Sequence, residues 1–312
     1  MLRSRFGLLA MGVALAGLSR CSCESTPAEG QEGGFDGDRA WGHLEELCRM
    51  GPRAHGLAGQ EKAREYIRAH LESLGVEVRE FPFEYRREGD ASPERFVNLA
   101  ARIGRGASKW VIVGSHYDTR LWAEEDSDAS KRDRPIEGAN DGGSGVAVLL
   151  ELARALRAEP PDIDVELLFF DAEDYGRPGS PDYFLGSKHV AAHLAELYPG
   201  ERPACVIVLD MVGDSDLRFL REGQSQRAFP WVNDLLWETA KRLDEPAFAA
   251  GGTRVVTDDH TAFLSIGVPA TLLIDFDYPY WHTTGDTLEQ CSAKSLGTTG
   301  RVLRSALIEG KF

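Results

Sequence analysis

The sequence is poor in basic residues: it has 35 Lys and Arg against 50 Asp and Glu, which gives a formal net charge of −15. Proteins that bind nucleic acids need clustered Lys and Arg to contact phosphates, so this composition argues against a nucleic-acid partner. The acidity suits cationic substrates such as free peptide N-termini, and it equally suits solubility. We therefore expect no nucleic-acid partner, and the charge alone does not decide between cationic substrates and solubility.

Cysteine is also scarce. After residue 23 only Cys48, Cys205 and Cys291 remain, with no CxxC and no Cys/His zinc-finger spacing. Disulfides are therefore not the organising framework of the fold. Cys205 lies in the apolar run ACVIVLD, which is typical of a core position.

Long apolar runs are absent except near the N-terminus, where residues 6–18 follow two early arginines. Residues 1–23 have the charged and apolar regions of an export signal and are too short for a permanent membrane span. Cys21 resembles a bacterial lipoprotein site with an atypical Arg20 before it, so a lipid anchor remains an open alternative. We expect an exported protein that is periplasmic, secreted or lipid-anchored, with no other membrane contact.

Residues 24–37 are polar, acidic and Gly-rich. Such a segment cannot bury enough apolar surface to order itself, so it predicts a flexible linker. The remaining residues, 38–312, suit one large catalytic domain, since single α/β domains often reach this size. We expect this domain to be monomeric.

The pattern of apolar residues in this domain alternates between strand and helix. Continuous apolar runs predict strands, and apolar residues at helical spacing predict helices between them. The strands are expected at 76–86, 95–103, 109–117, 163–170, 204–210 and 268–274, and the helices at 41–50, 59–73, 143–156, 187–197 and 231–242, with a short one from 260 and a last one from 293. This pattern predicts a three-layer α/β fold with a mostly parallel, mixed sheet and helices on both faces.

Polar residues follow four of the predicted strands. In open α/β sheets the functional site forms beyond the carboxyl ends of the strands. The polar residues at these ends are His116 with Asp118, Glu173 with Asp174, Asp210, and His282. Four such clusters at one edge predict a shared site.

The residue types at this edge are those that zinc prefers. A catalytic zinc site usually takes three protein ligands from imidazole and carboxylate groups and keeps one position open. The candidate ligands are Asp141, Asp174, Asp210, His116 and His282. Each has an ordinary alternative: Asp141, in GANDGGSG, can cap a helix, and a single loop histidine is more often structural. The adjacent acids Glu173 and Asp174 beside an apolar strand end indicate that a cation relieves their repulsion.

Several motifs, in their order along the chain, resemble bacterial glutaminyl-peptide cyclotransferases and, more widely, the zinc-dependent aminopeptidase family that contains them. The likeness covers nearly all of the predicted domain. The motifs are HYDT (116–119), GANDGGSGVAVLLELARAL (138–156), LLFFDAEDYG (167–176), LGSKH (185–189), VLDMVGD (208–214), TDDHTAF (257–263), IGVPATLLID (266–275) and WHTTGDT (281–287), with GPR at 51–53.

The resemblance implies a role for each matching position. Asp141, Asp174 and His282 would be the ligands of one zinc per chain. Glu173 would be the general acid and base. Asp210 and Asp258 would be two hydrogen-bonded acids beside it, and Trp281 would form a wall of the pocket for the substrate glutamine. From the residues alone, Asp258 can instead cap the following helix and Trp281 can instead be core. The implied activity is conversion of N-terminal glutamine to pyroglutamate with release of ammonia.

Two alternatives remain open. The NDGGSG loop is close to the form common in aminopeptidases, whereas animal cyclases differ there. Asp174 stands where both animal cyclases and most of these aminopeptidases have Glu, although bacterial cyclase-like sequences also show DAEDYG. In a di-zinc aminopeptidase, His116 and Asp210 would bind a second zinc, with Asp141 bridging the two ions. Trp281, the Asp-Asp-His triplet at 258–260 and the DAEDYG string together favour the cyclase. A catalytically silent binding domain is the other alternative, which the complete set of acids and histidines disfavours.

Overall fold

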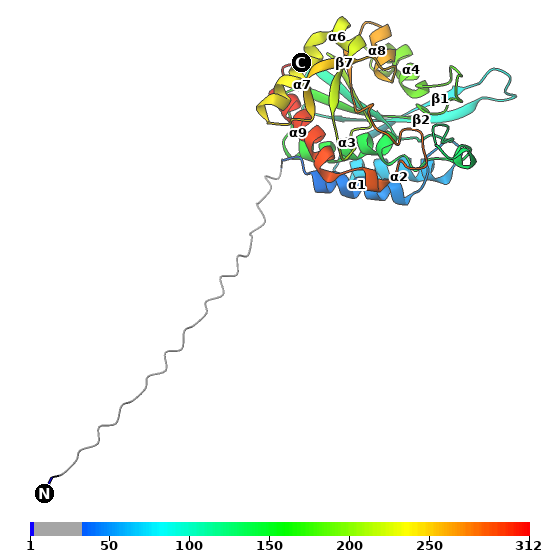
Figure 1. Ribbon diagram of the computed structural model, residues 1–312. Helices are drawn as coiled ribbons and strands as arrows, with labels where there is room; N and C mark the ends of the chain where they lie inside the picture. The colour runs from blue at the N-terminus through cyan, green and yellow to red at the C-terminus, as the bar shows by residue number, and fades with distance from the viewer. Residues whose placement is uncertain (3–32) are drawn as a thin grey trace. The chain divides into compact units, whose positions relative to one another are not determined.

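The computed structural model describes residues 1–2 and 33–312 (Figure 1). Residues 3–23 of the predicted export signal, including Cys21, and residues 24–32 of the expected linker lie outside the described residues. Helices in the described part of the chain all fall short of the length and apolar content that a bilayer crossing requires.

Six strands form one mixed sheet in the order β1–β2–β4–β3–β5–β8. The strands β4, β3, β5 and β8 run parallel to one another, whereas β1 and β2 join the edge beside β4 in antiparallel fashion. This confirms the predicted mostly parallel, mixed sheet. The six strands are β1 (Val78–Tyr85), β2 (Glu94–Ile103), β3 (Trp110–His116), β4 (Asp164–Phe170), β5 (Val206–Asp210) and β8 (Ala270–Ile274).

Helices cover both faces of this sheet, as Figure 1 shows. Alternate residues of one strand point to opposite faces, so Val111 and Val113 of β3 join one apolar cluster while Trp110 and Ile112 join the other. The first cluster includes α1 (Gly37–Arg49), α2 (Ala58–Ser73), α3 (Gly145–Ala158), α7 (Pro230–Arg242) and α9 (Ala293–Glu309), and the second includes α4 (Leu185–Ala192) and α8 (His260–Ser265). Burial on both faces explains why the central strands are continuously apolar.

Some local elements differ from those predicted. The helix expected over 187–197 is divided into α4 and the single turn α5 (Leu194–Leu197), because His193 lies outside the helical region at φ −110° and ψ 19°. A separate parallel pair, β6 (Phe219–Glu222) with β7 (Phe248–Arg254), and the short helix α6 (Gly223–Ala228) were not predicted. Short helical turns lie at Ala129–Lys131, Ala139–Ser144 and Leu288–Gln290.

The folded domain begins before residue 38. Helix α1 starts at Gly37, and the Asp36 side chain caps it by accepting hydrogen bonds from the amides of Asp38 (2.9 Å) and Arg39 (3.3 Å). Phe35 is buried, with its ring so close to Gly300 of α9 that a Cβ there would lie 2.0 Å from the ring. Residues 35–37 therefore belong to the domain and not to the expected 24–37 linker.

The sheet brings the predicted site residues to one edge. His116 at the end of β3 pairs with Phe170 at the end of β4, and Asp210 at the end of β5 pairs with Ile274 at the end of β8. Since these strands are parallel, the loops that follow them leave from the same edge.

The contacts of Phe35 and Asp36 lead to a first prediction, measured by denaturant unfolding of the full chain. Phe35→Ala should lower the free energy of unfolding by about 3 kcal/mol, because it removes a buried ring packed on α9. Asp36→Ala should cost about 1 kcal/mol through the lost helix cap. If both variants unfold like the unmodified chain, residues 35–37 are linker after all.

Candidate metal centre

Three of the predicted metal ligands lie together in the structure. The Nε2 atom of His282 is 3.7 Å from Oδ2 of Asp141 and 3.5 Å from Oδ1 of Asp174, and all three side chains are buried. Zinc holds its donor atoms at roughly 2.1 Å in tetrahedral geometry, which places neighbouring donors roughly 3.4 Å apart. Both distances from His282 are therefore close to the separation of neighbouring zinc ligands.

His116 lies next to this group, at the end of β3. Its Nε2 atom is 3.3 Å from Oδ1 of Asp141 and 3.2 Å from Oδ1 of Asp210. One ligand atom each from His116, Asp141 and Asp174 also lies within 4.8 Å of the others. Burial by itself would lower the pKa of His116, but the surrounding carboxylates, Glu173 foremost, raise it well above its ordinary value. The cluster thus has an excess of negative charge.

Two atoms of the cluster, Nδ1 of His116 and Oδ2 of Asp174, make no hydrogen bond among the described residues. The Oδ2 atom of Asp174 is buried and accepts no hydrogen bond. A buried carboxylate oxygen without a partner is costly unless a cation compensates for it. The donor set, its spacing and this orphan oxygen together fit a zinc ion.

Asp141 is placed by the turn at Ala139–Ser144. Asp286 accepts hydrogen bonds from the amides of Asn140 (2.9 Å) and Asp141 (3.1 Å), which fixes this turn beneath the cluster. A Cβ at Gly142 would lie 2.6 Å from the His116 ring, so glycine is required for this close approach. The N-cap of α3 is Ser144, so Asp141 is not its helix cap.

Glu173 and Asp174 lie in the loop after β4. Asp118, which follows β3, accepts hydrogen bonds from both of their amides at 3.1 Å. Burial and the neighbouring Asp174 charge raise the pKa of Glu173 well above its ordinary value. For Asp174, burial raises the pKa, but His282 and Arg120 outweigh it and hold the pKa below its usual range. The pKa values of the two adjacent acids are therefore shifted in opposite directions.

Asp210 and Asp258 line the same cavity as Glu173. Burial, followed by the charge of Asp210, raises the pKa of Asp258 to about 7. Asp210 Oδ1 lies 3.2 Å from Nε2 of His116. A direct hydrogen bond between Asp210 and Asp258, expected from the family resemblance, is not found among the contacts of the described residues. Asp258 makes no side-chain cap of α8, because the N-cap there is Asp259.

The cavity has a volume of about 610 Å³, and both polar and apolar side chains line it. The Trp281 ring lines the wall and stacks on the His282 ring, with centroids 3.9 Å apart and an angle of 24° between the planes. The position of Trp281 thus agrees with the predicted wall residue. The lining also includes Glu124, Tyr183, Phe184, Arg254, Val255 and Phe276.

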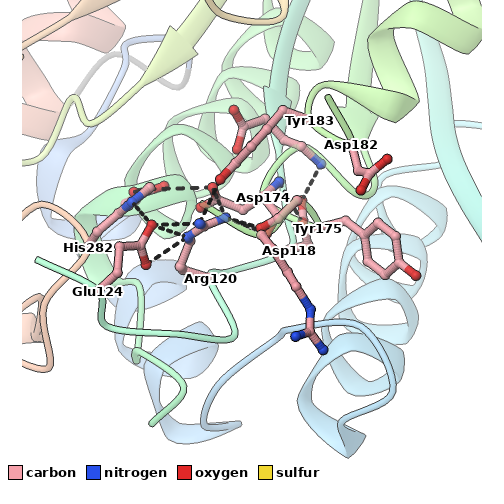
Figure 2. A network of polar contacts seen from close by, with 12 residues as sticks. Asp118, Arg120, Glu124, Asp174, Tyr175, Asp182, Tyr183 and His282 are labelled. Atoms are coloured by element: carbon pink, nitrogen blue, oxygen red, sulfur yellow. Dashed lines mark hydrogen bonds and ion pairs between the residues drawn. The ribbon is translucent and has the colours of Figure 1, made fainter. Parts of the chain in front are cut away.

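Two residues beside the cluster, Arg120 and Glu124, carry no signal in the sequence that marks them as functional (Figure 2). Oε1 of Glu124 lies 2.9 Å from Nδ1 of His282, and Arg120 contacts both Glu124 and the backbone of Asp174. Glu124 lies in a polar loop with several other charged residues, and it is 158 positions away from His282. Only the folded structure distinguishes it from its neighbours.

The chain is similar to known proteins in sequence and in fold. Residues 98–307 match the family described as Peptidase family M28. The glutaminyl-peptide cyclotransferase of Bos taurus is 27% identical over 297 residues, which cover 82% of this chain and 78% of that protein. The crystal structure of Fimbriiglobus ruber glutaminyl cyclase superposes with a TM-score of 0.83 at 32% identity, covering 91% of this chain and 99% of that one. A leucine aminopeptidase precursor from Bacteroides thetaiotaomicron superposes with a TM-score of 0.84 at 27% identity, covering 89% and 98%.

The matched region spans more than half of the chain and contains the buried cluster from His116 to His282. Both the cyclases and the aminopeptidase share nearly the whole described fold. With the buried carboxylate and imidazole groups at the edge of its sheet, this chain belongs to peptidase family M28 and is similar, within it, to the glutaminyl cyclases.

Proposed function

We propose that this protein is a zinc-dependent glutaminyl-peptide cyclotransferase, which converts N-terminal glutamine of peptides to pyroglutamate and releases ammonia. The observation that carries the proposal is the buried group of Asp141, Asp174 and His282 beside Glu173, on the wall of one cavity with Trp281. The likeness to glutaminyl cyclases over nearly the whole described chain supports the choice of reaction.

Asp141, Asp174 and His282 would hold one zinc. When bound, zinc supplies Lewis acidity that makes the side-chain amide carbonyl of glutamine more electrophilic. Two carboxylates with the Nε2 of an imidazole are the mixed donor set that catalytic zinc takes, and Nε2 of His282 lies 3.7 and 3.5 Å from the Asp141 and Asp174 oxygens.

Glu173 would move the proton that the reaction transfers. The α-amine nitrogen forms a bond to the side-chain carbonyl carbon, and the bond from that carbon to the amide nitrogen breaks. Glu173 accepts the proton that the attacking amine loses and donates it to the departing nitrogen, which leaves as ammonia. A buried carboxyl on the cavity wall suits both steps, since it can exchange protons without competition from bulk water.

The cavity would hold glutamine folded back on itself. Amine and carbonyl belong to one molecule, so orientation is the main requirement and no covalent link to the protein is needed. The flat Trp281 ring gives a wall against which an amide side chain can pack. Asp210 and Asp258 add carboxyl groups on the same wall, where a substrate α-amine finds acceptors. Peptide or protein N-termini are therefore the proposed substrates.

A di-zinc aminopeptidase is the second candidate, and one observation favours it. His116 Nε2 is 3.3 Å from Asp141 and 3.2 Å from Asp210, so Asp141 can be shared between two sets of ligands. The resemblance to a leucine aminopeptidase precursor agrees with this arrangement. Metal count and reaction product separate the two candidates.

Metal dependence gives the second prediction. Removing zinc with a chelator should abolish activity, and added zinc should restore it, because the proposed ligand set is built for one cation. Asp141→Asn and His282→Ala should both retain the fold by circular dichroism but lose zinc by elemental analysis. Full activity of a preparation shown to be metal-free would end the proposal.

The role of Glu173 gives the third prediction. Glu173→Gln should keep zinc and fold but lower the turnover number by ~10²-fold or more, the usual scale of acid–base catalysis. Glu166→Gln is the matched control, since Glu166 is also fully buried but lies near the opposite end of β4. Near-native turnover of Glu173→Gln would place the proton transfer elsewhere, and loss of zinc would make Glu173 a ligand.

The choice between one metal and two gives the fourth prediction. The purified protein should contain one zinc per chain, release ammonia from a peptide with N-terminal glutamine, and release little free leucine from a peptide with N-terminal leucine. The two assays are run on the same preparation and compared by kcat/KM. Two tightly bound zinc ions with fast leucine release would instead establish the aminopeptidase.

A further inference from the structure

His282 is held at two points by the loop that follows β3. Its Nδ1 atom lies 2.9 Å from Oε1 of Glu124, and its backbone carbonyl accepts a hydrogen bond of 3.2 Å from the amide of Glu125. His282 also has a left-handed backbone conformation, with φ of 51°. Non-glycine residues keep this conformation only where the surroundings determine it, so these contacts are needed to hold His282 in place.

The contact with Glu124 decides which face of the imidazole is free. A carboxylate at Nδ1 favours the tautomer with its proton on that nitrogen. The lone pair of Nε2 is then directed toward Asp141 and Asp174, whose carboxylate oxygens lie 3.7 and 3.5 Å away. Glu124 therefore prepares His282 to bind a metal through Nε2.

Arg120 fixes Glu124 in turn. Its side chain is fully buried, and it donates from Nε to both carboxylate oxygens of Glu124 (2.8 and 3.0 Å) and from Nη2 to Oε1 (2.5 Å). A planar guanidinium bound to both oxygens holds the carboxylate plane as well as its position. The orientation of Glu124 therefore depends on Arg120.

The other side of the same guanidinium contacts the loop that carries Asp174, the second candidate ligand. Nη1 of Arg120 donates to the carbonyl oxygens of Gly176 (2.6 Å) and Asp174 (3.2 Å) and lies 3.6 Å from Oδ1 of Asp174. Nη2 also donates to the hydroxyl of Tyr183, a residue of the cavity wall, at 2.7 Å. Figure 2 shows these contacts converging on Arg120 from segments that are far apart in the sequence.

We propose that Arg120 and Glu124 act as one positioning unit, which sets the Nε2 of His282 and the carboxylate of Asp174 at the spacing that binds zinc tightly. The inference rests on the metal centre of the proposed function but not on which reaction that centre performs. Neither residue needs to touch substrate for this role. Groups that orient metal ligands typically contribute about 10- to 100-fold to metal affinity.

Glu124→Ala is the decisive variant, because Glu124 is partly exposed and its loss leaves the buried Arg120 its contacts with two carbonyls and Tyr183. Glu166→Ala is the control: Glu166 is likewise a glutamate paired with arginine, through Arg79 (2.6 Å) and Arg102 (2.7 Å), but it is fully buried and lies away from the cluster. Glu124→Gln retains an oxygen that can accept from His282 but loses the charge.

The readouts are the zinc dissociation constant, measured by competition with a chromophoric chelator, and the thermal midpoint with and without zinc. Glu124→Ala should bind zinc about 10- to 100-fold more weakly, with Glu124→Gln between it and the unmodified chain. The rise in thermal midpoint that zinc causes should also be smaller for Glu124→Ala than for the unmodified chain. Glu166→Ala should lower both midpoints equally and leave the zinc dissociation constant unchanged.

The proposal is overturned if Glu124→Ala binds zinc within twofold of the unmodified chain. It is also overturned if Glu124→Ala behaves like Glu166→Ala, with both midpoints lowered equally, since that result marks a purely structural pair. A failure of the proposed function is separable: an unmodified chain that binds zinc but does not cyclise glutamine refutes the reaction, while weaker zinc binding by Glu124→Ala still supports the positioning unit.

Discussion

The concentration of negative charge at one buried edge of the sheet is the constraint on which the rest of this structure depends. An ionised carboxylate is stable away from water only if hydrogen bonds, cations or shared protons compensate for it. The carboxylates concerned are those of Asp118, Asp141, Glu173, Asp174, Asp210 and Asp258. The forms of compensation differ: two backbone amides donate to Asp118, His282 and Arg120 face Asp174, and burial with the Asp174 charge raises the pKa of Glu173. A bound cation completes this balance.

Buried acids also organise the loops of the site. Asp118 binds the amides of the loop after β4, and Asp286 binds the amides of the turn that carries Asp141. Each loop at the edge is thus fixed by a side chain from another loop, although none of them is a regular helix or strand. This arrangement gives irregular backbone the rigidity that a metal centre requires.

The strands of the sheet and the candidate metal ligands can be predicted from the sequence, whereas the contacts around those ligands cannot. Continuous apolar runs mark β3, β4, β5 and β8, because a doubly covered strand leaves no polar face. The parallel order of these strands brings Asp174 and His282 together, as predicted. The pair β6 and β7 has no such signal, since the sequence FAAGGTR of β7 is Gly-rich and largely exposed. The extended conformation of β7 depends on its pairing with β6 and not on an apolar pattern of its own. The role of Glu124 and Arg120 depends on contacts with residues that are distant in the sequence, so periodicity and spacing do not identify them.

The packing of α1 against α9 joins the two ends of the described domain. Leu44 and Leu47 of α1 and the Phe35 ring share a core with residues of the last helix, which ends at Glu309. Helix α1 also packs on α3, but the part of its surface that α9 covers has no partner in a growing chain until α9 has been made. The apolar core that α1 shares with α9 is therefore completed only after translation of α9.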